Sequence, residues 1–186
     1  ALLEVDHIRD FAKSLSLGNR KPFVIATTHT QARYVLPEVL GCFSRKYPGV
    51  ELILQHGNPS QIVQALASGA ATIGVTPHTD SSARNIAFLE CRMNRRIVLA
   101  PKDHPLTQRK QCSLHELAKY PLVAFESSSS AWQSVLKVFD AAGVKPNIVL
   151  SAIDADVVKD CIERGLGLTA LTEVAYNPKR DHGLVI

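Results

Sequence analysis

Small polar side chains gather at residues 27–31, where Thr27, Thr28, Thr30 and Gln31 surround His29. Short hydroxyl and amide groups can accept hydrogen bonds from the first N–H groups of a helix or donate them to an oxyanion. A helix N-terminus also leaves backbone N–H groups unpaired and carries a partial positive charge that favours anions. The cluster is therefore interpreted as a helix cap, as an anion-binding site, or as both.

A second run of hydroxyl groups, at residues 127–130, precedes another apolar-periodic segment. One helix cap needs one hydroxyl, and each of the two clusters has more than that. Two helix starts rich in neutral donors would suit a small anion or carboxylate held without a formal cation. Trp132 follows the second cluster and is interpreted either as a core residue or as a wall of the binding pocket.

Catalytic motifs are missing from the sequence. The serines lie outside a G-x-S-x-G elbow, there is no P-loop, and the glycines of 165–171 precede a strand rather than a helix. His29 could act as a general base oriented by Asp154 or Asp156, but no spacing supports that arrangement. The four cysteines form no metal-binding pair, which indicates reduced and mostly buried thiols. We therefore expect neither an enzyme nor a bound metal or cofactor.

Each polar cluster is expected to lie where a strand ends and a helix begins, and strands and helices alternate along the sequence. Short apolar runs predict strands, and periodic apolar segments with caps and glycine stops predict helices, one of which has Val39 on its inward face. The alternation predicts an α/β fold with parallel sheets and right-handed crossovers. The expected strands are 23–26, 50–55, 71–76, 85–91, 95–102, 121–125, 147–152 and 166–171, and the expected helices are 2–16, 31–47, 58–69, 113–120, 129–143 and 154–165.

The elements form two series of strands and helices, expected over residues 21–91 and 92–186. Two α/β halves of this size bind ligands in the cleft between them, outside the carboxyl ends of their strands. Residues 1–20 precede both halves, and the amphipathic segment 2–16 has no compact domain of its own. That segment is expected to pack on something outside the chain or on a second copy of itself.

The composition limits the function classes further. Of the 186 residues, 46% are hydrophobic, which is enough for a folded core. The net charge of +4 would suit an anionic ligand, but the charges are scattered and form no basic stripe for nucleic acid. No apolar run is long enough for a membrane span, and the N-terminal residues do not resemble a secretory leader. A cytoplasmic protein that contacts no membrane is expected.

Four segments carry a resemblance to a known family: "TTHTQARY" (27–34), "DHPL" (103–106), "ELAKYPLVAF" (116–125) and "DADVVKDCIERGLGLTAL" (154–171). From residue 22 onward the chain resembles the effector-binding domain of LysR-type transcriptional regulators. The first segment and the start of the last resemble the CysB/Cbl subgroup, whose members control sulfur assimilation and sulfonate use.

The resemblance implies a fold and an assembly. Members have two Rossmann-like subdomains of the type 2 periplasmic-binding-protein kind, with a ligand cleft between them. A linker helix and a winged helix-turn-helix precede these subdomains, and the proteins form dimers or tetramers. Residues 1–20 then resemble the end of the linker helix, 21–91 the N-terminal part of subdomain I, and 92–186 subdomain II. The family's final return to subdomain I is expected to be missing, and promoter DNA would be contacted only through the absent N-terminal domain.

The resemblance also implies ligand-binding positions, with three departures from the subgroup's pattern. Ser130 stands where a ligand-facing threonine is expected, and Ile153 stands where a polar threonine is expected. Pro77 also stands where the subgroup has a threonine, and Thr76, one residue earlier, could supply the hydroxyl in its place. The loss of a hydroxyl favours an effector with an apolar part over sulfate alone. The full set of expected ligand-binding residues is Thr28, His29, Thr30, Gln31, Thr76, Pro77, Ser129, Ser130, Ile153 and Asp154.

The sequence is therefore interpreted as a sensor of a small anionic sulfur-related effector, such as sulfate, an O-acetylserine-like compound, adenylyl sulfate or a sulfonate. Binding would change DNA recognition by the absent domain. The alternative is a periplasmic-type solute-binding protein for a small anion, which would share the fold. A secretory leader and the lack of an oligomerising helix would distinguish that alternative.

Overall fold

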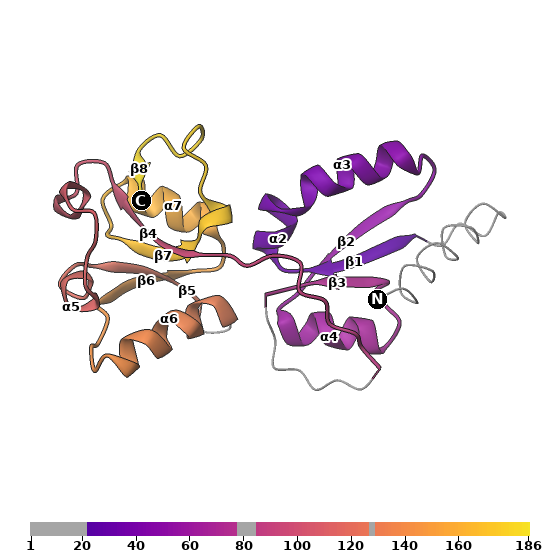
Figure 1. The fold of residues 1–186 in the computed structure, drawn as a ribbon, viewed down its shortest axis with the longest axis horizontal. Coiled ribbons are helices and arrows are strands. Elements are labelled where there is room, and N and C mark those ends of the chain that lie inside the picture. The colour runs from indigo at the N-terminus through magenta and orange to yellow at the C-terminus, as the bar shows by residue number, and fades with distance from the viewer. Residues whose placement is uncertain (1–21, 78–84, 127–128) are drawn as a thin grey trace. The chain divides into compact units, whose positions relative to one another are not determined.

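The protein is described by a computed structural model that covers residues 22–77, 85–126 and 129–186. The chain divides into two compact units, Ala1–Ile86 and Ala87–Ile186, whereas the sequence predicted a division after residue 91. The helix predicted at 2–16 lies outside the described residues. The two units are coloured along the chain in Figure 1, and each is described here by itself.

The first unit is built on a parallel sheet, as the sequence predicted, and its three strands have the order β2-β1-β3. The strands are β1 (Phe23–Thr27), β2 (Leu52–His56) and β3 (Ile73–Val75). The last residue of β1, Thr27, is paired with His56 on one side and with Val75 on the other. The carboxyl ends of all three strands therefore meet at one edge of the sheet.

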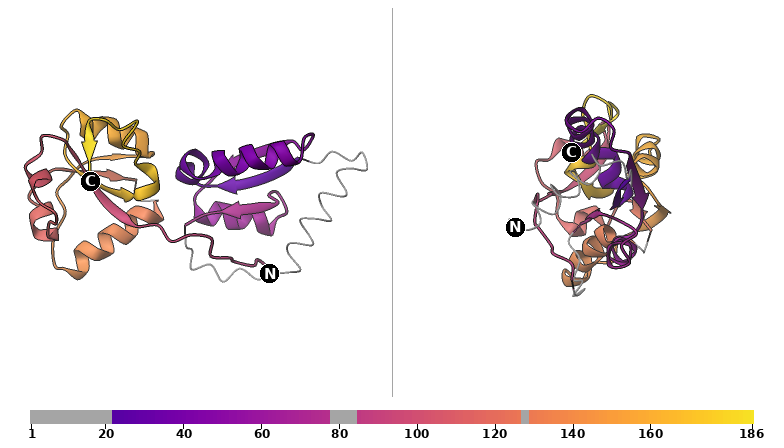
Figure 2. Two further views of the ribbon diagram at one scale, coloured as in Figure 1. Left: turned by 45° about the horizontal axis from the view of Figure 1, so that its top comes forward. Right: turned by 90° about the vertical axis from the view of Figure 1, so that its right-hand side faces the viewer.

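Helices cover both faces of this sheet, with α3 (Leu36–Lys46) on one side and α4 (Pro59–Ala67) on the other (Figures 1 and 2). Successive strand side chains point to opposite faces, so β1 supplies both cores. Phe23 and Ile25 pack with Leu36 of α3. Ala26 packs with Ile62 of α4. β1 is thus buried on both faces, which explains its uninterrupted apolar sequence.

The single helix predicted over 31–47 is wrong, because two helices occupy that segment. They are α2 (His29–Tyr34) and α3, joined at Val35. Pro37 lies in the first turn of α3, where no N–H group is needed. In the interior of a single continuous helix, Pro37 would lack the N–H donor and its ring would clash with an earlier carbonyl. Val39 was expected to face inward, but it is 57% exposed. The helix that begins after the break presents a different face to the sheet.

The second unit contains parallel and antiparallel strand pairs, so the prediction of wholly parallel sheets is wrong for this unit. β5 (Leu122–Phe125) pairs in parallel with β6 (Ile148–Ala152). β4 (Arg96–Pro101) is antiparallel to β7 (Thr169–Thr172) and to β8 (Leu184–Val185). No strand forms at 85–91, where Leu89 is 65% exposed. Because an extended segment rather than a crossover helix precedes β4, the strand enters the sheet from its carboxyl edge.

A close backbone approach joins β5 to the segment before β7. Leu122 forms a parallel bridge with Leu168, and the Leu168 N–H donates to the Pro121 carbonyl at 2.9 Å. Gly167 has a φ of +146°, and a Cβ there would collide with the same carbonyl. Gly167 therefore serves chain packing rather than nucleotide binding.

Helices α6 (Ser130–Ala141) and α7 (Ala155–Glu163) cover opposite faces of the second unit's sheet (Figures 1 and 2). Trp132 is only 2% exposed and packs in a core with Phe139 and Leu168, so it is a core residue. Short helices complete the unit: η1 (Pro105–Gln108), α5 (Leu114–Leu117) and η2 (Glu173–Ala175). The thiols of Cys42, Cys91 and Cys112 are free and exposed, which corrects the expectation that most would be buried.

Candidate functional site

The carboxyl edge of the first unit's sheet brings two predicted ligand-binding residues together. Thr27 at the end of β1 is paired with Val75 at the end of β3, and Thr28 and Thr76 follow them directly. The neighbouring strand β2 ends here with His56. Parallel pairing thus brings together residues that are almost 50 positions apart in the chain.

The hydroxyl oxygens of Thr28 and Thr76 are both buried, and neither has a hydrogen-bond partner among the residues that the structure describes. A buried hydroxyl without a partner costs about 1–3 kcal/mol, so native proteins rarely keep one without a reason. Two such groups on adjacent strand ends are a specific feature of this edge. Both are capable of donating a hydrogen bond to an oxyanion.

Helix capping does not account for the Thr28 hydroxyl. Thr28 is the N-cap residue of α2, with extended backbone angles of φ −78° and ψ 158°, but its side chain accepts no hydrogen bond from the helix. By contrast, Asn58 at the start of α4 accepts from the Gln61 N–H at 2.9 Å and forms a full capping box. Of the interpretations left open by the sequence, a simple cap by Thr28 is therefore wrong.

The remaining polar residues of the first cluster lie on α2. His29 is exposed, and its ring centroid is 5.6 Å from that of His56. Thr30 is half-buried and Gln31 is buried. His56 was not among the predicted site residues, because the strand was expected to end one position earlier. His56 is paired with Thr27 in the sheet, and this pairing could not be read from the sequence because it depends on the register of β2 against β1. Pro77 directly follows Thr76 and is half-buried.

At the second unit's carboxyl edge, the predicted residues follow β5 and β6. Phe125 is paired with Ala152, so the segments leading to Ser129 and Ile153 start side by side. The Ser129 hydroxyl accepts a hydrogen bond from the Trp132 N–H at 3.3 Å and caps α6, of which Ser130 is the first residue. Asp154 caps α7, because one carboxylate oxygen accepts from the N–H groups of Asp156 and Val157 at 2.9 and 3.0 Å.

An exposed apolar pair stands beside the Asp154 cap. Ile153 is 76% exposed, and Val157, one helical turn further on, is 48% exposed. Glu126, at the end of β5, donates its backbone N–H to the Ala152 carbonyl and carries a second carboxylate at this edge. The described part of this edge therefore combines apolar surface with two carboxylates, which do not favour a further negative charge.

Metal binding and membrane insertion find no support in the described residues. In these ranges no three His, Cys, Asp or Glu side chains lie close enough together to hold a metal ion. No helix found there is long and apolar enough to cross a membrane.

Two α/β units, each with polar residues at the carboxyl ends of its parallel strands, define a ligand-binding protein of the type 2 periplasmic-binding-protein-like class. The family model of the LysR substrate binding domain matches residues 17–186. The chain therefore belongs to the LysR substrate-binding domain family, and it falls among the CysB- and Cbl-like members.

Individual relatives support this assignment. The HTH-type transcriptional regulator SsuR of Burkholderia cenocepacia is 37% identical over 184 residues, which is 99% of this chain and 60% of SsuR. The HTH-type transcriptional regulator CysB of the same species is 34% identical over 183 residues, which is 98% of this chain and 58% of CysB. The chain thus spans at most 60% of the length of these two relatives.

A solved structure supports the same family assignment. The crystal structure of the cofactor-binding domain of the Cbl transcriptional regulator matches with a TM-score of 0.79 and 36% sequence identity. The match covers 90% of this chain and 74% of that one. These relatives are regulators rather than enzymes or transport proteins, which favours the sensor interpretation over a solute-binding protein.

Proposed function

We propose that the chain is the effector-sensing part of a LysR-type regulator of sulfur-related genes and that its effector is a small sulfur-containing anion. Support for this proposal comes from the similarity to SsuR, CysB and Cbl and from the "TTHTQARY" and "DADV" segments. The relatives are longer than this chain, so we assign promoter contact to a DNA-binding domain outside these 186 residues.

The two unpaired hydroxyls at the first unit's edge are the observation that carries the proposal. Thr28 and Thr76 hold buried oxygens without partners at adjacent strand ends. The negative group of an effector would accept a hydrogen bond from each of them. The positive end of the helical segment that starts at His29 adds to this attraction. Hydrogen bonds to a charged group contribute about 1.5–3 kcal/mol each, which offsets the cost of burying the hydroxyls.

The second unit's edge supports an effector that is not anionic throughout. The carboxylates of Glu126 and Asp154 would repel a negative group, whereas Ile153 and Val157 offer exposed apolar surface. We therefore propose an effector that carries carbon atoms as well as a sulfonate or sulfate group. Inorganic sulfate lacks the apolar part and would bind more weakly.

Signalling requires that the effector bind one conformation of the regulator better than another, because a ligand with equal affinity for both shifts nothing. The effector would thereby favour one arrangement of the protein and alter promoter binding. Linkage then demands that promoter DNA change effector affinity by the same factor in the full-length regulator.

Isothermal titration of the chain with sulfate, O-acetylserine, adenylyl sulfate and a series of alkyl sulfonates tests the proposal. We expect an alkyl sulfonate to bind more tightly than sulfate. The double variant Thr28→Val and Thr76→Val should lose at least about tenfold in affinity per hydroxyl removed.

Thr72→Val is the matched control for this experiment. Thr72 lies at the opposite end of the same sheet, and its hydroxyl accepts from the Val24 N–H at 3.3 Å. This variant should bind every ligand as the parent does. If the double variant binds the preferred anion as tightly as the control does, the anion is held elsewhere and the proposed site is wrong.

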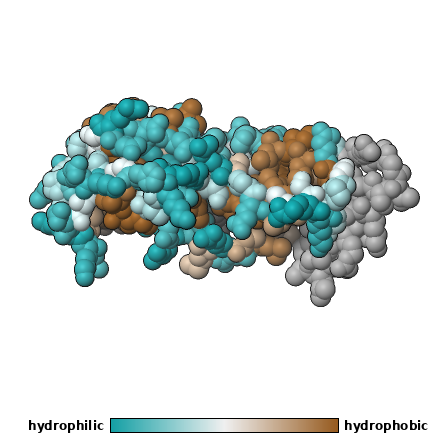
Figure 3. All heavy atoms as spheres, turned by 90° about the horizontal axis from the view of Figure 1, so that it is seen from above, coloured by the Kyte–Doolittle hydropathy of each residue, from teal (hydrophilic) through white to brown (hydrophobic). Residues whose placement is uncertain are grey.

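We also infer that the chain associates with itself, which two exposed strand edges support. β2 and β6 are edge strands in their sheets and expose Ile53, Ile148 and Val149. Two helix residues are exposed as well, Val39 on α3 at 57% and Val138 on α6 at 55%. Figure 3 shows apolar atoms at the surface of the unit that carries α3. Exposed apolar residues along an unpaired strand edge are typical of an interface.

Sedimentation equilibrium tests this association. The chain should form a dimer or a larger oligomer at micromolar concentration, and Val39→Asp with Val149→Asp should shift it toward monomer. The control Met93→Asp introduces the same charge at a residue that is 85% exposed and lies outside β2, β6, α3 and α6. A parent chain that remains monomeric at high concentration would contradict the inference.

A further inference from the structure

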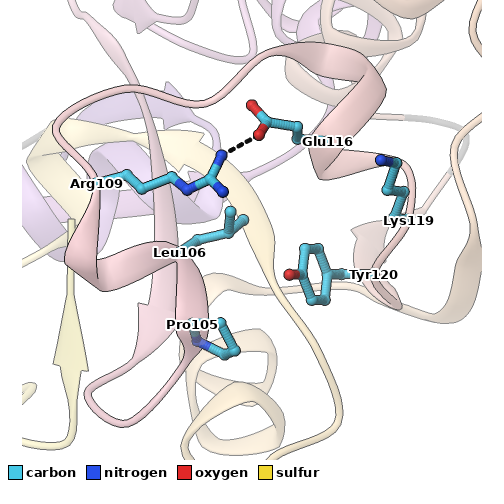
Figure 4. Close-up of a pocket in the computed structure, with 6 residues that line it drawn as sticks. All are labelled: Pro105, Leu106, Arg109, Glu116, Lys119 and Tyr120. Atoms are coloured by element: carbon cyan, nitrogen blue, oxygen red, sulfur yellow. Dashed lines mark hydrogen bonds and ion pairs between the residues drawn. The ribbon is translucent and has the colours of Figure 1, made fainter.

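A separate hollow lies within the unit Ala87–Ile186, and its six lining residues are Pro105, Leu106, Arg109, Glu116, Lys119 and Tyr120. It encloses about 400 Å³, part of which is open to solvent. In Figure 4, Arg109 and Glu116 reach toward each other along one side of the hollow, with Leu106 and Tyr120 beneath them. The sequence had singled out "DHPL" and "ELAKYPLVAF" only as family resemblances, and these segments supply all of the lining residues except Arg109.

The hollow lies at the opposite end of the sheet from the proposed effector edge. Tyr120 comes just before β5, whereas the effector edge begins after Phe125 at the end of that strand. β4 reaches the same end, because its Ala100 and Pro101 pair with β8 shortly before η1 starts. Four residues of strand separate the two edges by roughly 13 Å. A ligand in the hollow would therefore not compete directly for the effector edge.

Local hydrogen bonds hold the apolar wall of the hollow in place. The Leu106 N–H donates to His104 Nδ1 at 3.2 Å, and the Thr107 hydroxyl donates to the His104 carbonyl at 2.7 Å. The His104 ring packs edge-on against Tyr120 with a centroid distance of 4.5 Å. Burial lowers the pKa of His104, which favours the neutral form that accepts the Leu106 N–H. The wall is thus preorganised for a flat apolar group.

The charges around the hollow leave a net positive balance. Glu116 is already paired, because it accepts from the Ser113 N–H at 3.0 Å, from the Ser113 hydroxyl at 3.2 Å and from Arg109. The Ser113 backbone N–H, followed by Arg109, lowers the pKa of Glu116, so the carboxylate is ionised at neutral pH. Arg109 has further N–H donors to offer. In the described ranges, neither the Lys119 ammonium nor the Tyr120 hydroxyl has a side-chain hydrogen bond or ion pair.

We propose that this hollow is a second ligand site that binds a small organic anion: a carboxylate, phosphate or sulfonate group attached to a flat apolar group. Arg109 and Lys119 hold the anionic group, and the Tyr120 hydroxyl donates to it. Leu106 and Tyr120 hold the apolar group, as in most small-ligand sites, where apolar walls carry a few polar contacts. An inorganic anion alone would lack the apolar contact and bind more weakly.

Benzenesulfonate is a suitable probe. Sulfate tests the anionic group alone, and benzyl alcohol tests the aromatic ring without a charge. Titrations followed by amide NMR should show benzenesulfonate shifting the signals of residues 105–109 and 116–120, with tighter binding than sulfate or benzyl alcohol. The same shifts should persist in the Thr28→Val and Thr76→Val double variant, because the proposed effector edge takes no part in binding at the hollow. That result separates failure of this site from failure of the proposed function.

Charge reversal at the rim provides the second test. Lys119→Glu should weaken benzenesulfonate binding at these signals by about tenfold, since it replaces an attractive charge by a repulsive one. The matched control Lys137→Glu makes the same change at an exposed position on α6, away from the hollow, and should leave binding unchanged. The proposal is overturned if millimolar benzenesulfonate leaves residues 105–120 unperturbed, or if both variants bind equally well.

Discussion

At the carboxyl edge of β1 and β3, the hydroxyls of Thr28 and Thr76 are buried and unpaired, whereas Ser129 and Asp154 at the edge of β5 and β6 are bonded to helix N–H groups. All four residues follow strands, and three of them are helix N-caps. Residue type therefore does not decide their role. The first edge leaves two hydroxyls without partners among the described residues, and the second uses its polar groups to stabilise its own helices.

The contrast has a consequence for stability. A polar group that is satisfied within the protein stabilises the fold, and its removal costs free energy. A buried polar group without a partner destabilises the fold, and its removal is neutral or favourable. Substitutions in the two units should therefore change the free energy of unfolding in opposite directions.

The largest effect is expected at Lys159, the most deeply paired charge of the second unit. Its ammonium contacts the carboxylates of Asp181 at 3.0 Å and Asp156 at 3.3 Å and donates to the Ala175 carbonyl. Lys159→Met should lower the free energy of unfolding by about 3 kcal/mol, because it leaves the Asp181 carboxylate, whose side chain is only 11% exposed, without its cation. Urea denaturation measures the change. Lys137→Met, at an exposed position, should have almost no effect; equal losses in the two variants would show that the buried pair is not special.

The opposite sign is expected at the first unit's edge. Thr28→Val with Thr76→Val removes two buried hydroxyls that lack partners, and valine keeps their shape. The free energy of unfolding should rise by about 2 kcal/mol without ligand, because the cost of burying the hydroxyls disappears. Thr72→Val should instead lose a little stability, since that hydroxyl accepts from Val24. A clear destabilisation of the double variant would mean that Thr28 and Thr76 are satisfied in the folded protein.

A smaller loss should follow removal of the second unit's caps. Asp154→Ala deletes the acceptor for two N–H groups at the start of α7, and Ser129→Ala deletes the acceptor for Trp132 at the start of α6. Each change should cost about 1 kcal/mol, the usual value of an N-cap. Thermal unfolding can resolve it. Asp154→Asn should retain most of the stability, because asparagine caps helices as well; if it behaves like alanine, the carboxylate has another role.

Local features of the fold were predictable from the sequence, and the relation between distant segments was not. The predicted helices at 113–120, 129–143 and 154–165 have local signals that the structure contains. These are the Ser113 and Glu116 capping box, the turn at Gly143, with φ +64°, and the Asp154 cap. The antiparallel direction of β4 depends on β7, more than 60 residues later, and no local pattern contains it. The break at Val35 had a local signal in Pro37, because proline is tolerated in the first turn of a helix and not in its interior.

The candidate site shows the same division. Thr28 and Thr76 were predicted individually, from a hydroxyl cluster and from a family resemblance. Their shared edge and their unpaired hydroxyls required the pairing of β1 with β3. His56 was missed, because only the register of β2 against β1 brings it beside His29. Packing also decided between the two roles considered for Trp132, which the sequence alone could not separate.

The smallest effect is expected at Ile153, an exposed apolar residue at the second unit's edge. Ile153→Thr adds a hydroxyl to the second edge and removes an apolar contact. Sulfate should then bind more tightly and an alkyl sulfonate less tightly. Because Ile153 is 76% exposed, each change should be only about threefold, well below the effect of a buried hydroxyl. Isothermal titration of parent and variant with both ligands measures the difference, with Val157→Thr as a comparison on the next turn. Unchanged affinities for both ligands would show that Ile153 does not face the effector, and the preference for an apolar part would then depend on Val157 alone.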